Sequence, residues 1–403
     1  MNKIPSLNKR AIIQDGNTAR LIELDWLRVL AFGLLIFYHI GMLYTQGWGW
    51  HYKSAYSSEF LANIMLWSNQ WRMSLLFLIS GAAVSFMLAK QSPWLFIRQR
   101  FIVLSLPIIF GMLVVVVPQV YVEANSTGKI IEHNYWRFWY IYLDQSSVEF
   151  TPYKTIGAMH LTWNHLWFLP YILVYSLIVA CIYPLFIRPC VVSFGGYLNG
   201  CISVGWVVAV PTLIFTLNSW LLYDRYPQTH NLIEDWFNHG RYFLVFFLGF
   251  LGVRTPSLWL QLARFRWSFL LPAILTYSYT LFVFHGGDLG DGWLMSEVNR
   301  LCGSANSWLW VLTVVAWAQH FFRATNLYLR YLNAGIFCFY ILHQTLIIVF
   351  AYWLAPLKLG PLLEPILLIV LVFSSCVLLY EFIKRIPFLH LVFGVKPPKA
   401  ERV

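Results

Sequence analysis

The chain has 403 residues, of which 59% are hydrophobic, 19% aromatic and only 11% charged, and its mean hydropathy is +0.62. A soluble protein of this length cannot bury so much apolar surface, so the composition excludes a soluble globular protein and indicates an integral membrane protein. The formal net charge of +11 would suit a nucleic-acid-binding protein, but the basic residues follow the positive-inside rule of membrane proteins instead.

Ten apolar segments are long enough to cross a bilayer, which predicts an all-α, polytopic membrane protein with about ten transmembrane helices. The predicted spans are 26–46, 61–88, 99–121, 162–187, 198–222, 238–254, 267–285, 306–321, 335–355 and 362–384. With both termini cytoplasmic, this topology places most of the Lys and Arg residues, and few of the acids, on the inner side. The first span lacks a small-residue cleavage site and is expected to be an uncleaved signal anchor.

The predicted organisation is one membrane domain with short polar ends. Residues 1–20 are expected to form a cytoplasmic arm, 21–386 the ten-helix domain and 387–403 a cytoplasmic tail. The outer loop at 122–161 is the only sizeable extramembrane segment. Its many aromatic residues could cap the membrane domain or cradle a sugar by stacking on its ring.

The first span carries two charged or titratable residues, Arg28 at its start and His39 deep inside. Their separation of eleven residues returns to within about 20° of the same helix face, so both are expected to face one cavity. At 1.5 Å per residue they stand roughly 16 Å apart along the axis. This geometry suits an elongated substrate that is charged at the Arg28 end and reacts at the His39 end.

Three more arginines have two interpretations each. Arg72 lies within the second span, where it needs either a partner such as the outer acid Glu59 or a water-filled cavity that holds substrate. Arg98 and Arg100 precede the third span; most such residues are topological anchors, but a cytoplasmic polyphosphate could also bind there through bidentate guanidinium contacts.

Histidines mark two later spans. Asn164 and His165 open the fourth span at about the height of His39, where they could form a proton-handling site beside Trp167. His343 lies at mid-depth in the ninth span and is either functional or hydrogen-bonded to a neighbouring helix. Because no His, Asp or Glu spacing has the specificity of a HExxH pattern, no metal site is predicted.

The order and spacing of five motifs resemble the acyltransferase-3 family over nearly the whole chain. The motifs are Leu24–Arg28 with ten residues before His39, then Phe77–Gly81, Arg98 with Arg100, His165–Leu169 and Tyr340–Gln344. The chain is most similar to the branch that contains the periplasmic glucan succinyltransferase. It departs from the O-antigen acetyltransferase branch, because Pro170-Tyr171-Ile172 stands where that branch carries a glutamate, so a glutamate acid–base role is not carried over.

The resemblance implies a bacterial inner-membrane O-acyltransferase that moves an acetyl or succinyl group from cytoplasmic acyl-CoA to a periplasmic or cell-surface carbohydrate. Combined with the residues, it suggests that Arg28, Arg98 and Arg100 bind the phosphates of coenzyme A. His39 would accept the acyl group or act as general base.

The resemblance also suggests roles around this histidine. His165 and Asn164 would orient the acceptor or stabilise the oxyanion. His343 would either hold His39 in one tautomer or contact the substrate. Arg72 and Trp167 would also contact the substrate. The expected partners are the carbohydrate and membrane lipid, not nucleic acid, and the oligomeric state is left open.

The strongest rival interpretation is a polytopic transporter or flippase for a glycan or a lipid-linked intermediate, because embedded charges also line transport paths. Two features argue against it. The two halves of the chain show no repeat of the Arg28-to-His39 pattern, and the embedded charges cluster in the first four predicted spans. A scaffold without enzymatic activity would leave His39, Arg72 and His343 unexplained.

Overall fold

The computed structural model describes residues 21–130, 132, 134–153, 161–186, 203–287, 290 and 292–395. The predicted arm at 1–20 and the end of the predicted tail at 396–403 lie outside these residues. The start of the tail forms the short helix α15 (Pro387–Val392). Within the described residues the structure is helical apart from turns, loops and one isolated β-bridge, between Thr45 and Ser58, so the predicted all-α class is confirmed.

Nine helical segments in the described part of the chain are long and apolar enough to cross a membrane. The crossing elements include α1 (Ile22–Tyr44), α2 (Glu59–Leu88), α3 (Pro93–Phe110) with α4 (Val117–Thr127), α6 (Phe168–Phe186), α8 (Val204–Leu222), α11 (Arg266–Phe284), α12 (Trp293–Phe321), α13 (Leu327–Leu354) and α14 (Gly360–Ile383). The remaining predicted span is α9 (Trp236–Gly252), which has 17 residues and would reach about 26 Å, close to the thickness of the hydrocarbon core. About ten spans therefore agree with the sequence prediction.

Several helix boundaries differ from the predicted spans, and the eighth span differs most. The prediction is 306–321, but α12 begins at Trp293. The extra turns carry polar residues such as Ser296, Asn299 and Arg300, which a hydropathy criterion excludes from a span. These residues line a cavity inside the protein, so the helix continues because protein and water, rather than lipid, surround its polar face.

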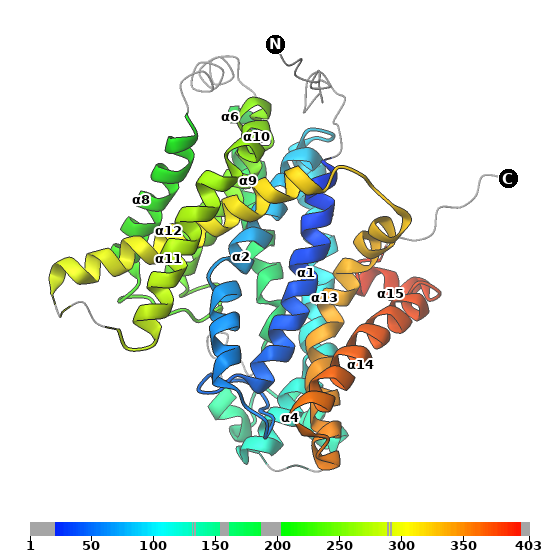
Figure 1. Cartoon of the computed structure of the whole chain (residues 1–403). Helices are drawn as coiled ribbons and strands as arrows, with labels where there is room; N and C mark the ends of the chain where they lie inside the picture. The colour runs from blue at the N-terminus through cyan, green and yellow to red at the C-terminus, as the bar shows by residue number, and fades with distance from the viewer. Residues whose placement is uncertain are drawn as a thin grey trace.

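The helices form a bundle with α1, α2 and α13 at its centre (Figure 1). Helices α8, α11 and α12 lie on one side of this centre, and α14 and α15 lie on the other. The short helix α10 (Pro256–Leu262) lies near the end of the bundle where α1 begins. Because α1 packs directly against both α2 and α13, side chains from these three helices can share one site.

Helices α2 and α9 approach each other through two glycines. A Cβ atom placed on Gly81 would lie 1.8 Å from the backbone oxygen of Phe246, and one on Gly249 would lie 2.0 Å from that of Leu78. Small residues permit such backbone contact between membrane helices. The contact fixes the height of α2, and therefore of Arg72, relative to α9.

The third span bends at a π-helical turn, Gly111–Val115, just before Pro118. A proline lacks the N–H that would continue the α-helical ladder, and π-turns often accompany such defects. Side chains from other elements bind the carbonyl oxygens of the turn: Tyr142 donates to Met112 O at 3.1 Å, Trp139 to Leu113 O at 2.8 Å and Thr345 to Val115 O at 2.6 Å.

The described part of the segment at 122–161 thus caps the bend of the third span. Trp139 and Tyr142 belong to α5 (Tyr135–Leu143), in which Phe138 and Tyr142 are buried while Trp136 and Tyr140 are exposed. None of these residues lines the large cavity described next. The sequence left open whether this segment caps the membrane domain or cradles a sugar. Its described residues cap the domain.

Candidate functional site

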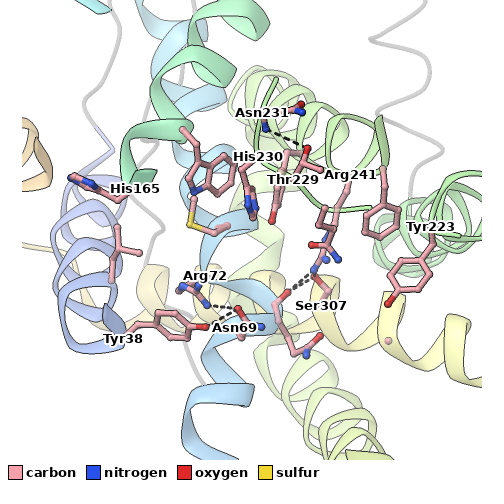
Figure 2. A pocket seen from close by; sticks show the side chains of 18 of the residues that line it. Tyr38, Asn69, Arg72, His165, Tyr223, Thr229, His230, Asn231, Arg241 and Ser307 are labelled. Carbon is pink, nitrogen blue, oxygen red and sulfur yellow. Dashed lines mark hydrogen bonds between the residues drawn. The ribbon is translucent and has the colours of Figure 1, made fainter. Parts of the chain in front are cut away.

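A cavity of about 1000 Å³ opens in the half of the bundle that holds the C-terminal end of α1. Its walls come from α1, α2, α8, α9, α12 and α13, the short 3₁₀ turn η3 (Asn164–Trp167) and the loop between α8 and α9. Figure 2 shows His165 and Tyr38 at one end, Arg72 and Asn69 between, and Arg241, Ser307 and Tyr223 toward the other end. Of the predicted pair Arg28 and His39, only His39 lines this cavity.

His39 and His343 contact each other directly across the α1–α13 interface. His39 Nδ1 lies 2.9 Å from His343 Nε2, and His343 Nδ1 lies 2.7 Å from the carbonyl oxygen of Tyr340. A carbonyl can only accept a hydrogen bond, so Nδ1 of His343 carries the proton and donates it. Nε2 of a neutral His343 then accepts from His39 Nδ1, which leaves Nε2 of His39 unprotonated on a ring that lines the cavity.

Aromatic rings hold the histidine pair in place. The ring of Trp50 lies 5.3 Å from that of His39, and Phe32 packs edge-on against His343 at 5.5 Å. Both histidines are buried, with His39 only 8% exposed. The imidazole pair is therefore fixed in orientation before any substrate binds.

His165 lies beside the pair but uses both ring nitrogens for protein contacts. Its Nε2 donates to Ile341 O at 3.1 Å, and its Nδ1 accepts from Gln119 Nε2 at 3.3 Å. The ring is 5.1 Å from that of His343 and edge-on to it. With both nitrogens occupied, His165 is suited to position its neighbours rather than to exchange a proton with substrate.

Gln119 is the centre of a buried hydrogen-bond network that the sequence analysis missed. It is fully buried; its Nε2 also donates to Thr345 at 2.7 Å, and its Oε1 accepts from Asn164 at 3.1 Å and Gln344 at 3.0 Å. The amide thus uses two donor and two acceptor positions. The signal that could have revealed it is a glutamine directly after Pro118 within an apolar span.

Asn164 adopts a backbone conformation that is rare for residues other than glycine, with a φ of 41°. Its side chain also accepts from Thr162 Oγ1 at 2.9 Å. A left-handed residue at the start of η3 turns the chain so that His165 can reach α13. Such strain at a cavity wall is typical of functional sites.

Arg72 is a buried cation whose partners are all neutral. Its guanidinium carbon lies 3.3 Å from the centre of the Tyr38 ring, and its Nη1 donates to Asn69 at 2.8 Å. The residue is 8% exposed and its Nε is buried without a hydrogen-bond partner. No described carboxylate lies within ion-pair distance of it, and Glu59, the partner considered from the sequence, is exposed to solvent.

Trp167 also lines the cavity and packs against the loop between α8 and α9. Its ring lies 4.2 Å from that of His230.

Asp235, which is fully buried, organises this loop by accepting from Tyr171 at 2.5 Å and from the backbone N–H groups of Thr229 and His230 at 3.2 Å. Burial lowers the pKa of His230 below its ordinary value, more than the nearby Asp235 raises it, so this imidazole stays neutral at neutral pH.

The loop after α1 also contributes to the cavity. Trp50 and His51 line it, and His51 Nδ1 binds the carboxylate of Glu123. Lys53 fastens the loop by donating to Met42 O at 2.7 Å and to Thr45 O. The loop is thus held so that Trp50 and His51 face the cavity.

The three arginines expected to bind the donor lie at the opposite end of the bundle from the cavity. Arg28 and Arg100 are close enough to repel each other electrostatically, and Arg100 Nε donates to Ser176 Oγ at 3.5 Å, while Arg98 is exposed. Phe32 stands between this end and His39 on the same face of α1 and is buried. Among the described residues, no group of three or more His, Cys, Asp or Glu side chains could hold a metal ion.

A helical bundle with His39 at the wall of a polar cavity and His343 behind it fits a polytopic membrane enzyme. A model of the acyltransferase-3 family, described as an acyltransferase domain, matches residues 21–381. The chain therefore belongs to the acyltransferase-3 family and is an O-acyltransferase that uses an acyl donor.

Curated relatives match along nearly their whole length. Glucans biosynthesis protein C of Salmonella schwarzengrund is 25% identical over 409 residues, which cover 93% of this chain and 94% of that protein. The protein of the same name from Salmonella paratyphi B is 24% identical with the same coverage. No solved structure matches the chain significantly.

Proposed function

We propose that this enzyme transfers an acetyl or succinyl group from cytoplasmic acyl-CoA to a hydroxyl group of a periplasmic or cell-surface glucan. The observation that carries the proposal is the hydrogen-bonded chain from the Tyr340 carbonyl through His343 to His39, because it leaves an unprotonated imidazole nitrogen at a cavity wall. The names of the relatives support a glucan as the acceptor.

In the proposed reaction, His39 Nε2 takes the proton of the sugar hydroxyl as its oxygen attacks the thioester carbonyl. A C–O bond forms, the C–S bond breaks, and the proton passes from His39 to the leaving thiolate. The products are the sugar ester and coenzyme A. A histidine suits both steps because its unperturbed pKa lies near neutrality. In the covalent alternative, Nε2 itself first accepts the acyl group and then passes it on.

The other residues of the site have supporting roles in this proposal. His343 holds His39 in the reactive tautomer. His165 and Asn164 both hydrogen-bond Gln119, and this network positions the acceptor. Trp167 offers a ring face for a sugar. Arg72 supplies positive charge to the donor's acyl group, either at the oxyanion or at the free carboxylate of a succinyl group.

The donor is proposed to bind at the other end of the bundle, with its phosphates on Arg28, Arg98 and Arg100. Two like charges held together at Arg28 and Arg100 would be stabilised by a polyphosphate. The distance along α1 from Arg28 to His39, roughly 16 Å, would be covered by the extended pantetheine arm. Because Phe32 is buried between Arg28 and His39 on the same face of α1, the arm would have to displace its ring.

This arrangement supports an orientation in the bacterial inner membrane with the arginine end cytoplasmic and the cavity end periplasmic. Most of the chain's basic residues fall on the arginine side, as expected for the cytoplasmic face. Both termini would then be cytoplasmic. Donor and acceptor would enter from opposite faces and meet at His39.

The test is transfer of a labelled acyl group by the purified enzyme from acetyl-CoA or succinyl-CoA to gluco-oligosaccharides. His39→Ala should lower the rate by roughly 10²–10⁴-fold, the usual contribution of a general base, while the protein remains folded. The matched control is His285→Ala, because His285 is exposed and does not line the cavity. Full activity of the His39→Ala enzyme would remove this histidine from the mechanism.

A further inference from the structure

The cavity extends well beyond the histidine pair. The end away from His39, here called the far arm, is formed by residues of α8, α9, α12 and the start of the α8–α9 loop. It comprises Asn218, Tyr223, Asp224, Arg241, Asn299 and Arg300. In Figure 2, Tyr223 and Arg241 lie at the opposite end of the cavity from His165. A cavity of about 1000 Å³ is at the upper end of the range for ligand pockets, roughly 300–1,000 Å³, so it can hold more than an acyl group and one sugar.

Two arginines give the far arm a fixed hydrogen-bonding surface. Arg241 donates through Nη2 to Gln70 O and Ser307 Oγ. Within the described part of the chain, its Nε and Nη1 have no acceptor, although the residue lines the cavity. Arg300 donates to Ser219 O at 3.0 Å and to Asp224 at 2.9 Å, which joins α12 to the end of α8.

The charge of the far arm suits a neutral, hydroxylated ligand. Arg300 pairs with Asp224 and, more weakly, with Glu297 at 3.9 Å, so these two acids together balance the charges of Arg300 and Arg241. The side chain of Asp224 is 71% exposed, so its carboxylate can accept hydrogen bonds from hydroxyl groups, and it would repel the phosphates of coenzyme A. Arginine can donate to hydroxyl oxygens at the same time.

An aromatic surface completes the far arm. Tyr223 is 52% exposed, and its ring is held edge-on to Phe237 at a centroid distance of 5.2 Å. An exposed ring face beside paired donors and acceptors is a suitable surface for one face of a sugar ring. The hydrogen-bonding groups, the charge and the aromatic face therefore indicate the same ligand chemistry.

We propose that the far arm is a second sugar subsite, which binds neutral sugar units beyond the one that is acylated. The inference rests on the proposed function and adds a binding site to it: the enzyme recognises the glucan through sugar units beyond the one that it acylates. The reacting unit of the glucan lies at His39, and the glucan continues along the cavity past Arg72 to Tyr223 and Asp224.

The test compares glucose with gluco-oligosaccharides of increasing length as acceptors for the purified enzyme. In the wild type, kcat/KM should rise with length until the far arm is filled. Tyr223→Ala and Asp224→Asn should each lower kcat/KM for long acceptors about tenfold more than for glucose, equivalent to about 1.4 kcal/mol. Tyr140→Ala is the matched control, because Tyr140 is exposed outside the cavity.

A second readout does not depend on turnover. Binding of the long oligosaccharide to the His39→Ala enzyme, measured by calorimetry, should weaken about tenfold when Tyr223→Ala or Asp224→Asn is added. The inference fails if all acceptor lengths react alike, if each variant affects glucose and oligosaccharide equally, or if Tyr140→Ala has the same effect. If the wild-type enzyme acylates no sugar and binds none, the proposed function fails instead.

Discussion

His39 owes its proposed reactivity to an atom it does not touch, the carbonyl oxygen of Tyr340. That oxygen fixes the proton on His343 Nδ1, and His343 in turn fixes the proton on His39 Nδ1. Orientation of a catalytic histidine by a second group is a recurring arrangement in enzymes. Here both groups that perform this role come from one turn of α13.

We expect His343→Ala to lower kcat by about 10–100-fold, the usual cost of removing a group that orients a functional imidazole. His343→Gln should retain more activity, because its side-chain oxygen can still accept from His39 Nδ1. Steady-state kinetics of the two variants check this expectation. Equal losses in both would contradict it, because the hydrogen-bond acceptor of glutamine would then make no difference.

Arg72 offers a way to identify the acyl group. If it binds a free carboxylate, Arg72→Gln should raise KM for succinyl-CoA by at least tenfold and leave acetyl-CoA nearly unaffected, because a charged hydrogen bond contributes about 1.5–3 kcal/mol. If it stabilises the oxyanion, kcat should fall for both donors. Initial rates with the two donors separate these roles, and unchanged kinetics with both would exclude either.

At the scale of elements, the glycine contact between α2 and α9 positions the cavity wall. Gly81→Ala should lower stability by about 2 kcal/mol, because the added methyl group meets the backbone of Phe246 and forces the helices apart. The control is Gly33→Ala on α1, where the added group meets nothing within 4 Å. Thermal unfolding in detergent compares the two, and a similar midpoint for both variants would contradict the packing argument.

The elements also show how far the sequence could predict the structure. Hydropathy located the spans because each is continuous and apolar, and the histidine spacing singled out α1, η3 and α13. Hydropathy could not locate the first turns of α12, because their polar residues face a cavity. The sequence also could not reveal the role of Gln119, because its hydrogen-bond partners come from η3 and α13. The far arm is likewise assembled from elements distant in sequence, so no local pattern marks it.

At the scale of the whole molecule, orientation can be measured directly. In intact cells, a membrane-impermeant thiol reagent should label Trp136→Cys, on the exposed face of α5, and should not label Trp94→Cys, near Arg98. Both positions are exposed, so accessibility within the protein does not distinguish them. Labelling of Trp94→Cys alone would invert the proposed topology.

In the proposed reaction, Phe32 would act as a barrier between the arginine end and the cavity. Its ring is buried between them, packed against Tyr340 and His343. A permanently open passage at this point would let protons and metabolites leak through the membrane. If the Phe32 ring moves aside only when the donor arm is inserted, the acyl group can reach the other side of the membrane. Coenzyme A would be retained, and protons would not leak through.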